Sequence, residues 1–368
     1  MKRVLWLAIS VSVFLLGITS AGAVPYEVRD LGTLGVAKSI NNSGQVVGES
    51  KISGSLSHAF LWLPQPGYGL PAGVNDLGTL PGGNESGARD INDSGQVVGW
   101  SYDSAGDRRV FFWQNGASTS VKTLGGSENY AYGINELGCI VGWSKLSTGH
   151  DHAFIWENHV VTALGKLPGD AASAARDVND SRQVVGYSVD SGGYARAVIW
   201  NTTGSITIED LGTLPGGRAS FAYDINSSAQ VVGYSDDGSR YQAVLWSTAG
   251  GTSIWRIPPA PAWVSSEALG INDKGQVVGS YWTSTGACHA FLWAAGDGVV
   301  NLPPLAGDTE SVAWAINESG QIVGASWLSG TADEHAVLWT PIPEPSGFLA
   351  LLCGLGGLGG VVWRRRRG

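Results

Sequence analysis

The side chains with the clearest chemical potential in this 368-residue sequence are carboxylates that lie close to aromatic residues. Paired carboxylates can cleave a glycosidic bond, and a carboxylate beside an exposed ring can hold a sugar by hydrogen bonding and stacking. We expect these side chains on the loops that lead into the first strand of each repeating unit. The candidate ligand-binding residues are Glu85, Glu128, Tyr130, Trp263, Glu310 and Trp314. The alternative is that they are solvated loop carboxylates and rings packed inside the fold.

Other kinds of catalytic or metal site have weaker support. There is no G-x-S-x-G elbow, no zinc-ligand spacing and no phosphate-binding loop. Asp90, Asn92 and Ser94 have the opening spacing of a calcium loop, but no bidentate glutamate follows at the twelfth position. A turn stabilised by the asparagine is the better interpretation. We therefore predict no catalytic residue, no metal and no cofactor.

A polar residue recurs four positions before a tryptophan, and three of these residues belong to the triplet His-Ala-Phe. On a strand such residues would lie in separate blades, too far apart to form one metal or general-base site. We therefore predict a repeated structural hydrogen bond. The seven residues are His58, Arg109, His152, Arg196, Gln242, His289 and His335.

The elements that position these side chains belong to a unit that occurs seven times. Each unit has an asparagine after Ile or Val, a glycine seven residues later, and an apolar segment that ends in tryptophan. Its length matches that of a four-stranded propeller blade. The asparagines are Asn41, Asn92, Asn135, Asn179, Asn226, Asn272 and Asn317, and the tryptophans are Trp62, Trp113, Trp156, Trp200, Trp246, Trp293 and Trp339.

The repeats predict an all-β fold, a seven-bladed β-propeller spanning residues 24–341. The third strand of a unit, such as His58–Trp62, is apolar on both faces, so it must lie between two other sheets. The last unit lacks a fourth strand, whereas the first is preceded by an unpaired one, Tyr26–Leu34. We expect this N-terminal strand to complete the last blade and close the ring.

Composition agrees with a turn-rich β protein. The chain has 54 glycines and only 14% charged residues, yet 43% of it is hydrophobic and it includes 16 tryptophans. This apolar content can form a core and excludes a disordered glycine-rich polymer. Three cysteines are too few for a disulfide framework. The net charge of −9 disfavours nucleic acid as a partner, and the domain between the termini is more acidic still.

Both ends of the chain are typical of export signals. Residues 1–23 combine Lys2 and Arg3 with an apolar run and a small-residue cleavage site, which predicts a signal peptide with an N-terminal helix. Residues 342–368 contain an uncharged stretch, Phe348–Trp363, long enough for a short transmembrane helix. A permanent C-terminal anchor is the alternative to a processed one.

The C-terminal segment resembles the PEP-CTERM sorting signal of Gram-negative bacteria. The motif is Pro343, Glu344 and Pro345, then the apolar stretch, then Arg364, Arg365, Arg366 and Arg367. The resemblance implies processing by signal peptidase and by a membrane-embedded exosortase, with membrane attachment through the C-terminal helix before processing. It also implies a place at the cell surface or outside the cell, in association with exopolysaccharide.

The repeats themselves resemble the HAF-repeat family of exported bacterial proteins. The triplets His58–Phe60, His152–Phe154 and His289–Phe291 carry this resemblance, together with the Asn-x-x-Gly-Gln-Val-Val-Gly run that begins at Asn41, Asn92 and Asn272. Units three, four and five depart from the run with Cys139, Arg182 and Ala229. The resemblance implies architecture and export, and no reaction.

The expected function is therefore that of a noncatalytic, exported propeller that binds extracellular polysaccharide or surface proteins. One alternative is a secreted carbohydrate-active enzyme, a glycoside hydrolase or lyase that uses loop carboxylates near the axis. Another is a protein-protein scaffold without affinity for sugars.

Overall fold

The computed structural model describes residues 25–54, 56–146, 149–259 and 263–343, and this part of the chain is built from 27 β-strands without a helix. Accordingly, none of the described segments forms a helix capable of crossing a membrane. The predicted signal peptide and nearly all of the predicted sorting segment, from Glu344 onward, lie outside the described residues. The helices predicted at the two termini therefore stay predictions.

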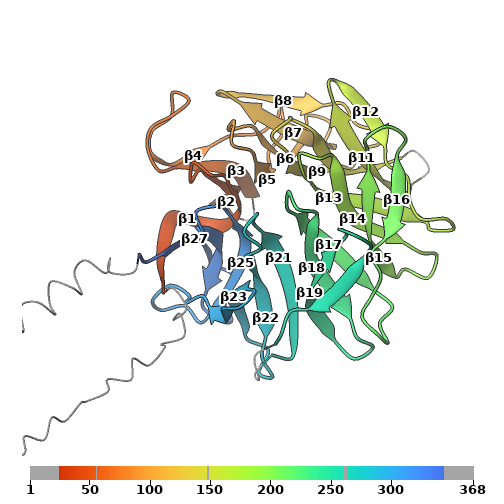
Figure 1. Ribbon diagram of the computed structural model, residues 1–368. Helices are drawn as coiled ribbons and strands as arrows, with labels where there is room; N and C mark the ends of the chain where they lie inside the picture. Colours follow the sequence, from red (N-terminus) through yellow and green to blue (C-terminus); the bar gives the residue numbers. More distant parts are fainter. Residues whose placement is uncertain (1–24, 55, 147–148, 260–262, 344–368) are drawn as a thin grey trace, which may run out of the picture.

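Five antiparallel sheets of four strands each follow the repeat as predicted, with consecutive strands joined by turns. Figure 1 shows the sheets side by side around a common centre. The five sheets are β5 (Ser86–Ile91), β6 (Val97–Tyr102), β7 (Arg108–Gln114) and β8 (Ala117–Val121); β9 (Asn129–Ile134), β10 (Ile140–Lys145), β11 (Asp151–Glu157) and β12 (Val160–Ala163); β13 (Ala172–Val178), β14 (Gln183–Val189), β15 (Ala195–Asn201) and β16 (Thr207–Asp210); β17 (Ser220–Ile225), β18 (Gln230–Asp236), β19 (Tyr241–Ser247) and β20 (Ser253–Arg256); and β21 (Ser265–Ile271), β22 (Val277–Trp282), β23 (Cys288–Ala294) and β24 (Gly298–Asn301).

The first and last repeats together form a single sheet of seven strands, which contains both ends of the described chain (Figure 1). In order of pairing, its strands are β25 (Glu310–Ile316), β26 (Ile322–Trp327), β27 (Glu334–Pro341), β1 (Tyr26–Ile40), β2 (Val46–Ser53), β3 (Leu56–Leu63) and β4 (Gly73–Asp76).

The long strand β1 is the reason for this seven-stranded sheet. Its first part pairs with β27, from Tyr26 opposite Pro341 to Leu34 opposite His335, and its second part pairs with β2. Register shifts near Asp30 and near Ala37, with Gly32 and Gly35 at positive φ, let the chain change partners within one strand.

The prediction of a seven-bladed β-propeller closed by the N-terminal strand is wrong. We expected Tyr26–Leu34 to be an unpaired fourth strand that precedes the first unit and completes the last blade. The pairing with β27 is present, but the chain continues as one strand into the pairing with β2, so the described residues form six sheets. The architecture is a multi-bladed β-propeller.

The hydrophobic core lies between neighbouring sheets. Val47 and Leu61 of the first repeat pack against Ala88 and Phe111 of the second, and equivalent clusters join the other neighbours. The two halves of the seven-stranded sheet also pack face to face, because Phe60 and Leu338 belong to one buried cluster. Strands that are apolar on both faces are buried on both faces, as the sequence predicted.

Glycine recurs at two positions in the repeat, and the physical reason for it differs between them. The N-x-x-G turn places Gly44 at φ 73°, with its amide donating to the Asn41 carbonyl at 3.0 Å, as predicted. The glycine of the second strand faces a register shift in the first strand instead. A Cβ at Gly48 would lie 2.0 Å from the Val36 carbonyl oxygen, so no side chain fits there.

Candidate functional site

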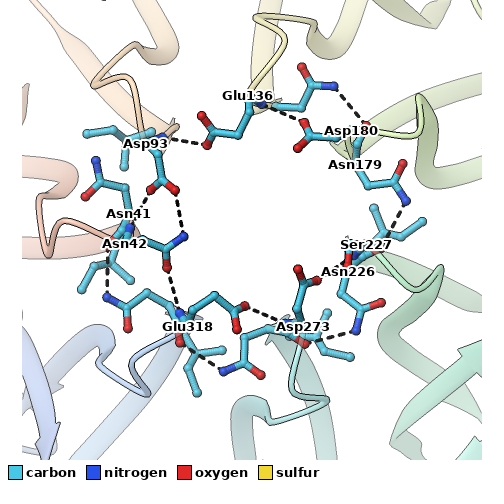
Figure 2. A pocket seen from close by; sticks show the side chains of 18 of the residues that line it. Asn41, Asn42, Asp93, Glu136, Asn179, Asp180, Asn226, Ser227, Asp273 and Glu318 are labelled. Carbon is cyan, nitrogen blue, oxygen red and sulfur yellow. Dashed lines mark hydrogen bonds between the residues drawn. The ribbon is translucent and has the colours of Figure 1, made fainter.

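The seven repeat asparagines form a closed circle of hydrogen bonds around the axis (Figure 2). Each Nδ2 donates to the backbone carbonyl of the asparagine in the next repeat, at 3.0 to 3.1 Å, and Asn317 donates back to Asn41. The circle joins seven turns from all parts of the chain. It therefore defines one end of the axial channel.

The same asparagine also stabilises its own turn, as predicted. Asn226 Oδ1 accepts from the amides of Ser228 at 3.1 Å and Gln230 at 3.0 Å, and its Nδ2 donates to Gln230 Oε1 at 2.8 Å. Only a carboxamide can accept two bonds within its own turn and also donate to the next repeat. The sequence predicted the turn, but the hydrogen bond between repeats forms only because the repeats are arranged around the axis.

The residue after each asparagine forms an outer rim with five carboxylates. They border a cavity of about 370 Å³ together with Asn42 and Ser227. Most of them already accept a backbone N–H from the preceding repeat, for example Asp93 Oδ1 from Asn42 at 2.7 Å and Glu318 Oε1 from Asp273 at 2.7 Å. Among the described residues no cluster has the geometry of a metal site. The rim therefore serves to join the repeats. Its carboxylates are Asp93, Glu136, Asp180, Asp273 and Glu318.

Three half-buried aspartates, Asp90, Asp177 and Asp224, form the next layer inside the channel wall. Asp90 accepts from Ser39 Oγ at 2.7 Å and from the Ile134 amide at 2.8 Å, and Asp224 accepts from the Ile271 amide at 2.8 Å. Burial, reinforced by the nearby Asp177, raises the pKa of Asp90 to about 6. Burial likewise raises the pKa values of Asp177 and Asp224, which face each other. These carboxylates bridge adjacent repeats.

Beyond the aspartates lies a second cavity of about 290 Å³, which we name the axial pocket. Each lining residue stands three positions before a repeat asparagine, so all seven repeats contribute one side chain. The lining combines cations with aromatic rings. It consists of Lys38, Arg89, Tyr132, Arg176, Tyr223, Leu269 and Trp314.

The cations of the axial pocket rest on its rings. Lys38 Nζ lies 3.5 Å from the centroid of the Trp314 ring, and the Arg176 guanidinium lies 4.0 Å from that of Tyr132. Arg89 forms an ion pair with Glu49 at 2.7 Å. Burial, together with the positive charge of Arg89, lowers the pKa of Lys38 to about 7.

Several polar atoms around the axial pocket lack partners. Arg89 Nε, Arg176 Nε and Trp314 Nε1 are buried and make no hydrogen bond among the described residues. A buried donor without a partner costs about 1–3 kcal/mol, so natural proteins rarely keep one without a reason. A ligand with acceptor oxygens would satisfy these donors.

The sequence candidates do not gather in one place. Only Trp314 lines the axial pocket, and Tyr130 stacks on its lining residue Tyr132 with centroids 5.7 Å apart. Trp263 is only 6% exposed and stacks on Tyr281 in the core, so it is not available on a loop surface.

The three candidate glutamates have local roles. Glu128 Oε2 lies 3.1 Å from Lys145 Nζ, and Glu310 Oε2 accepts from the Cys288 amide at 3.2 Å. Glu85 is half-buried before β5, and its carbonyl accepts from the Tyr102 amide at 3.0 Å. Sequence reasoning missed Lys38, Arg89 and Arg176, although their shared distance from the repeat asparagine was a usable signal.

The predicted hydrogen bonds of the polar residue before each tryptophan are confirmed at four positions. His58 Nδ1 lies 2.9 Å from Asp76, and Arg109 Nε lies 2.8 Å from Asp103. Arg196 joins Asp170 and Asp210 at 2.9 and 3.1 Å, and His335 lies 3.4 Å from Asp308. Arg109 and Arg196 lie in separate four-stranded sheets, whereas His58 and His335 lie on β3 and β27 of the seven-stranded sheet.

Comparison with known proteins gives the fold and no family. No family model and no curated protein matches the sequence. Among solved structures, virginiamycin B lyase from Staphylococcus aureus is 12% identical with a TM-score of 0.53, and the match covers 86% of this chain and 100% of that one. A puromycin hydrolase is 12% identical with a TM-score of 0.58, covering 84% of this chain and 52% of that one. A prolyl endopeptidase is 11% identical with a TM-score of 0.56, covering 86% and 51%. These likenesses support a propeller fold alone.

Proposed function

We propose that this protein is an exported, noncatalytic β-propeller that binds a saccharide in its axial pocket, at the cell surface or in extracellular polysaccharide. The observation that carries the proposal is the pocket lining, in which three aromatic side chains stand beside buried donors without partners. Sugar rings stack on aromatic faces, and their hydroxyl groups accept such hydrogen bonds.

The pocket is held by a rigid frame. Every lining side chain comes from the first strand of a repeat, and each of these strands ends at an asparagine of the closed circle. A preformed site loses little conformational freedom when a ligand binds. This arrangement supports binding as the function of the axis.

Processing and partners remain part of the same proposal. The basic N-terminal segment and the Pro-Glu-Pro motif with its arginine cluster support export by signal peptidase and sorting by exosortase. Binding to extracellular polysaccharide then occurs after the chain has left the cytoplasm.

A glycan array probed with the purified full chain tests this function. We expect binding that Trp314→Ala weakens about tenfold or more, because the ring forms one wall of the pocket. Trp255→Ala is the matched control, since Trp255 is 50% exposed on β20, outside the axial pocket. Absence of any glycan binding, or equal losses in both variants, would contradict the proposal.

A carbohydrate-active enzyme is the second candidate, and Glu267 is the residue that favours it. Burial raises the pKa of Glu267. Its Oε1 accepts a hydrogen bond from Ser280 Oγ at 3.3 Å, and its negative charge acts to raise the pKa of Lys38 in the axial pocket. A glutamate with a raised pKa near a sugar site is suited to general acid catalysis. Oligosaccharide cleavage that Glu267→Gln abolishes would favour this candidate over binding alone.

A further inference from the structure

The charges of the axial pocket are incompletely compensated. Lys38, Arg89 and Arg176 come from three different repeats, and only Arg89 has an ion pair, with Glu49. Among the described residues, Arg176 and Lys38 make no salt bridge, and the charged groups of both lie over aromatic rings. The pocket therefore has two cations whose charge no contacting carboxylate neutralises.

The Arg176 guanidinium is held in a fixed position. It lies between the rings of Tyr132, Tyr187 and Tyr223, at 4.0, 5.5 and 5.8 Å from their centroids, and its Nε has no partner. Stacking on rings restricts a guanidinium without using its N–H groups. The Nε–H of Arg176 therefore remains free for an acceptor.

We propose that the axial pocket is selective for a carboxylate-bearing sugar unit of about the size of one hexuronate, with its carboxylate between Arg176 and Lys38. This inference rests on the proposed saccharide function and deepens it by naming the ligand class. A carboxylate matches the fork of a guanidinium in a bidentate geometry, and the sugar ring can lie against Trp314 or Tyr223.

The size and charge of the surroundings favour a single acidic unit over a long polyanion. A cavity of about 290 Å³ is at the lower end of the range for ligand pockets. The rim at the asparagine end of the channel carries five carboxylates, and the chain has a net charge of −9. This field repels a polyanion from that end, whereas one acidic residue inside the pocket meets local positive charge.

Binding of an anion is coupled to protonation of Lys38. The charged groups around Lys38 are Arg89 on β5, Glu49 on β2, Glu334 on β27 and Glu267 on β21. Because the pKa of Lys38 is about 7 in the free protein, most of the amine is neutral at pH 8. A bound carboxylate favours the ammonium form, so binding takes up protons at pH 8 and affinity falls as pH rises above 7.

Isothermal titration calorimetry of the purified full chain with glucuronate, glucose and acetate tests the inference. We expect glucuronate to bind at least tenfold more tightly than glucose, and a binding heat at pH 8 that changes with the ionisation enthalpy of the buffer. Arg176→Gln should reduce glucuronate affinity tenfold or more and leave glucose affinity nearly unchanged, and Arg176→Lys should retain part of the preference. Lys38→Gln should remove the buffer dependence.

The control is Arg218→Gln, because Arg218 is exposed and lies outside the pocket. Equal affinity for glucose and glucuronate, or an unchanged preference in Arg176→Gln with a native melting temperature, overturns the inference and leaves the saccharide function standing. If acetate binds as tightly as glucuronate, the pocket is an anion site that does not recognise the sugar ring, and the saccharide function is overturned. A full chain that binds none of the three overturns the inference, and the glycan array then decides the function separately.

Discussion

At the scale of single residues, asparagine is required by two bonding demands that no other side chain meets. Its carbonyl oxygen accepts amide protons within its own turn, and its NH2 group donates to the carbonyl of the next repeat. Aspartate satisfies the first demand and fails the second. The Nδ2 atom of each asparagine thus links its turn to the turn of the next repeat by a hydrogen bond.

Asn226→Asp should therefore destabilise the protein by about 2–3 kcal/mol, because two acceptors, Gln230 Oε1 and the Asn272 carbonyl, lose their donor and face a carboxylate. Urea unfolding at pH 7 measures the change. Ser228→Ala, in the same turn but exposed, is the control and should change the free energy of unfolding by less than about 0.5 kcal/mol. Equal effects of the two substitutions would refute this role.

A second residue-scale prediction concerns Ala229, which occupies the left-handed turn position at φ 59° where most repeats have glycine. The left-handed conformation costs a non-glycine residue about 1–2 kcal/mol. Glycine removes this cost, but part of the gain is lost because glycine raises the conformational entropy of the unfolded chain. Ala229→Gly should stabilise the protein by roughly 0.5–1 kcal/mol. The reciprocal change, Gly275→Ala at φ 73°, should destabilise it by a similar amount. A rise in melting temperature for the second variant would contradict the argument.

At the scale of elements, strand β1 decides how the first and last repeats are joined. One strand supplies hydrogen bonds to β27 along its first part and to β2 along its second, so neither partner is left as a free edge there. An exposed edge strand invites pairing with other chains. The strand therefore contributes both to stability and to protection against association.

Deletion of residues 24–34 should remove the pairing with β27 and leave that with β2. We expect a lower melting temperature, loss of a single cooperative transition and concentration-dependent association through the exposed β27 edge. Circular dichroism and light scattering measure these changes. A chain that begins at Val24 is the control. A deletion variant that melts like this control would show that the pairing of β1 with β27 contributes nothing to stability.

At the scale of the whole molecule, the axis collects ionisable groups that the rest of the fold excludes from water. Burial raises the pKa of Asp90 to about 6 from an ordinary value of 3.8, and lowers that of Lys38 to about 7 from 10.5. Asp90 faces Asp177, Ser39 and the Ile134 amide, so its environment is formed by three other repeats. Stability and pH are therefore linked through the channel.

The signs of these shifts predict a stability minimum between about pH 6 and pH 7. Between pH 3.8 and 6 the folded state retains the Asp90 proton that the unfolded chain releases, so the free energy of unfolding falls as pH rises. Between pH 7 and 10.5 the unfolded chain binds the Lys38 proton that the folded state has lost, so the free energy of unfolding rises with pH. Urea midpoints from pH 4 to pH 9.5 measure both arms. Asp90→Asn should make the acidic arm shallower, and the rest of that arm comes from Asp177 and Asp224, whose pKa values are also raised. Lys38→Met should flatten the alkaline arm, while a monotonic profile would disprove the linkage.

The strands and turns of each repeat depend on local sequence, so they could be predicted from the sequence alone. The seven asparagines, the alternation of apolar segments and the N-x-x-G turns determine the strands, because turn chemistry and burial on both faces act within one repeat and its neighbours. The unpaired strand before the first repeat also indicated the pairing with β27. A sequence cannot show by itself that this strand continues without a turn into the next pairing.

The candidate site was harder to predict, because it is formed by convergence. Lys38, Arg89 and Arg176 are far apart in sequence and face one another only after the repeats surround an axis. Trp263 lies on a loop before β21, but its side chain is buried against Tyr281. A large ring on a loop next to the interface between two sheets can fill space in the core. The sequence alone determined the repeat, its strands and its turns, for these depend on neighbours in the chain. The tertiary structure alone decided the shared β1, the circle of asparagines and the charged axial pocket, because these arise from where distant repeats meet.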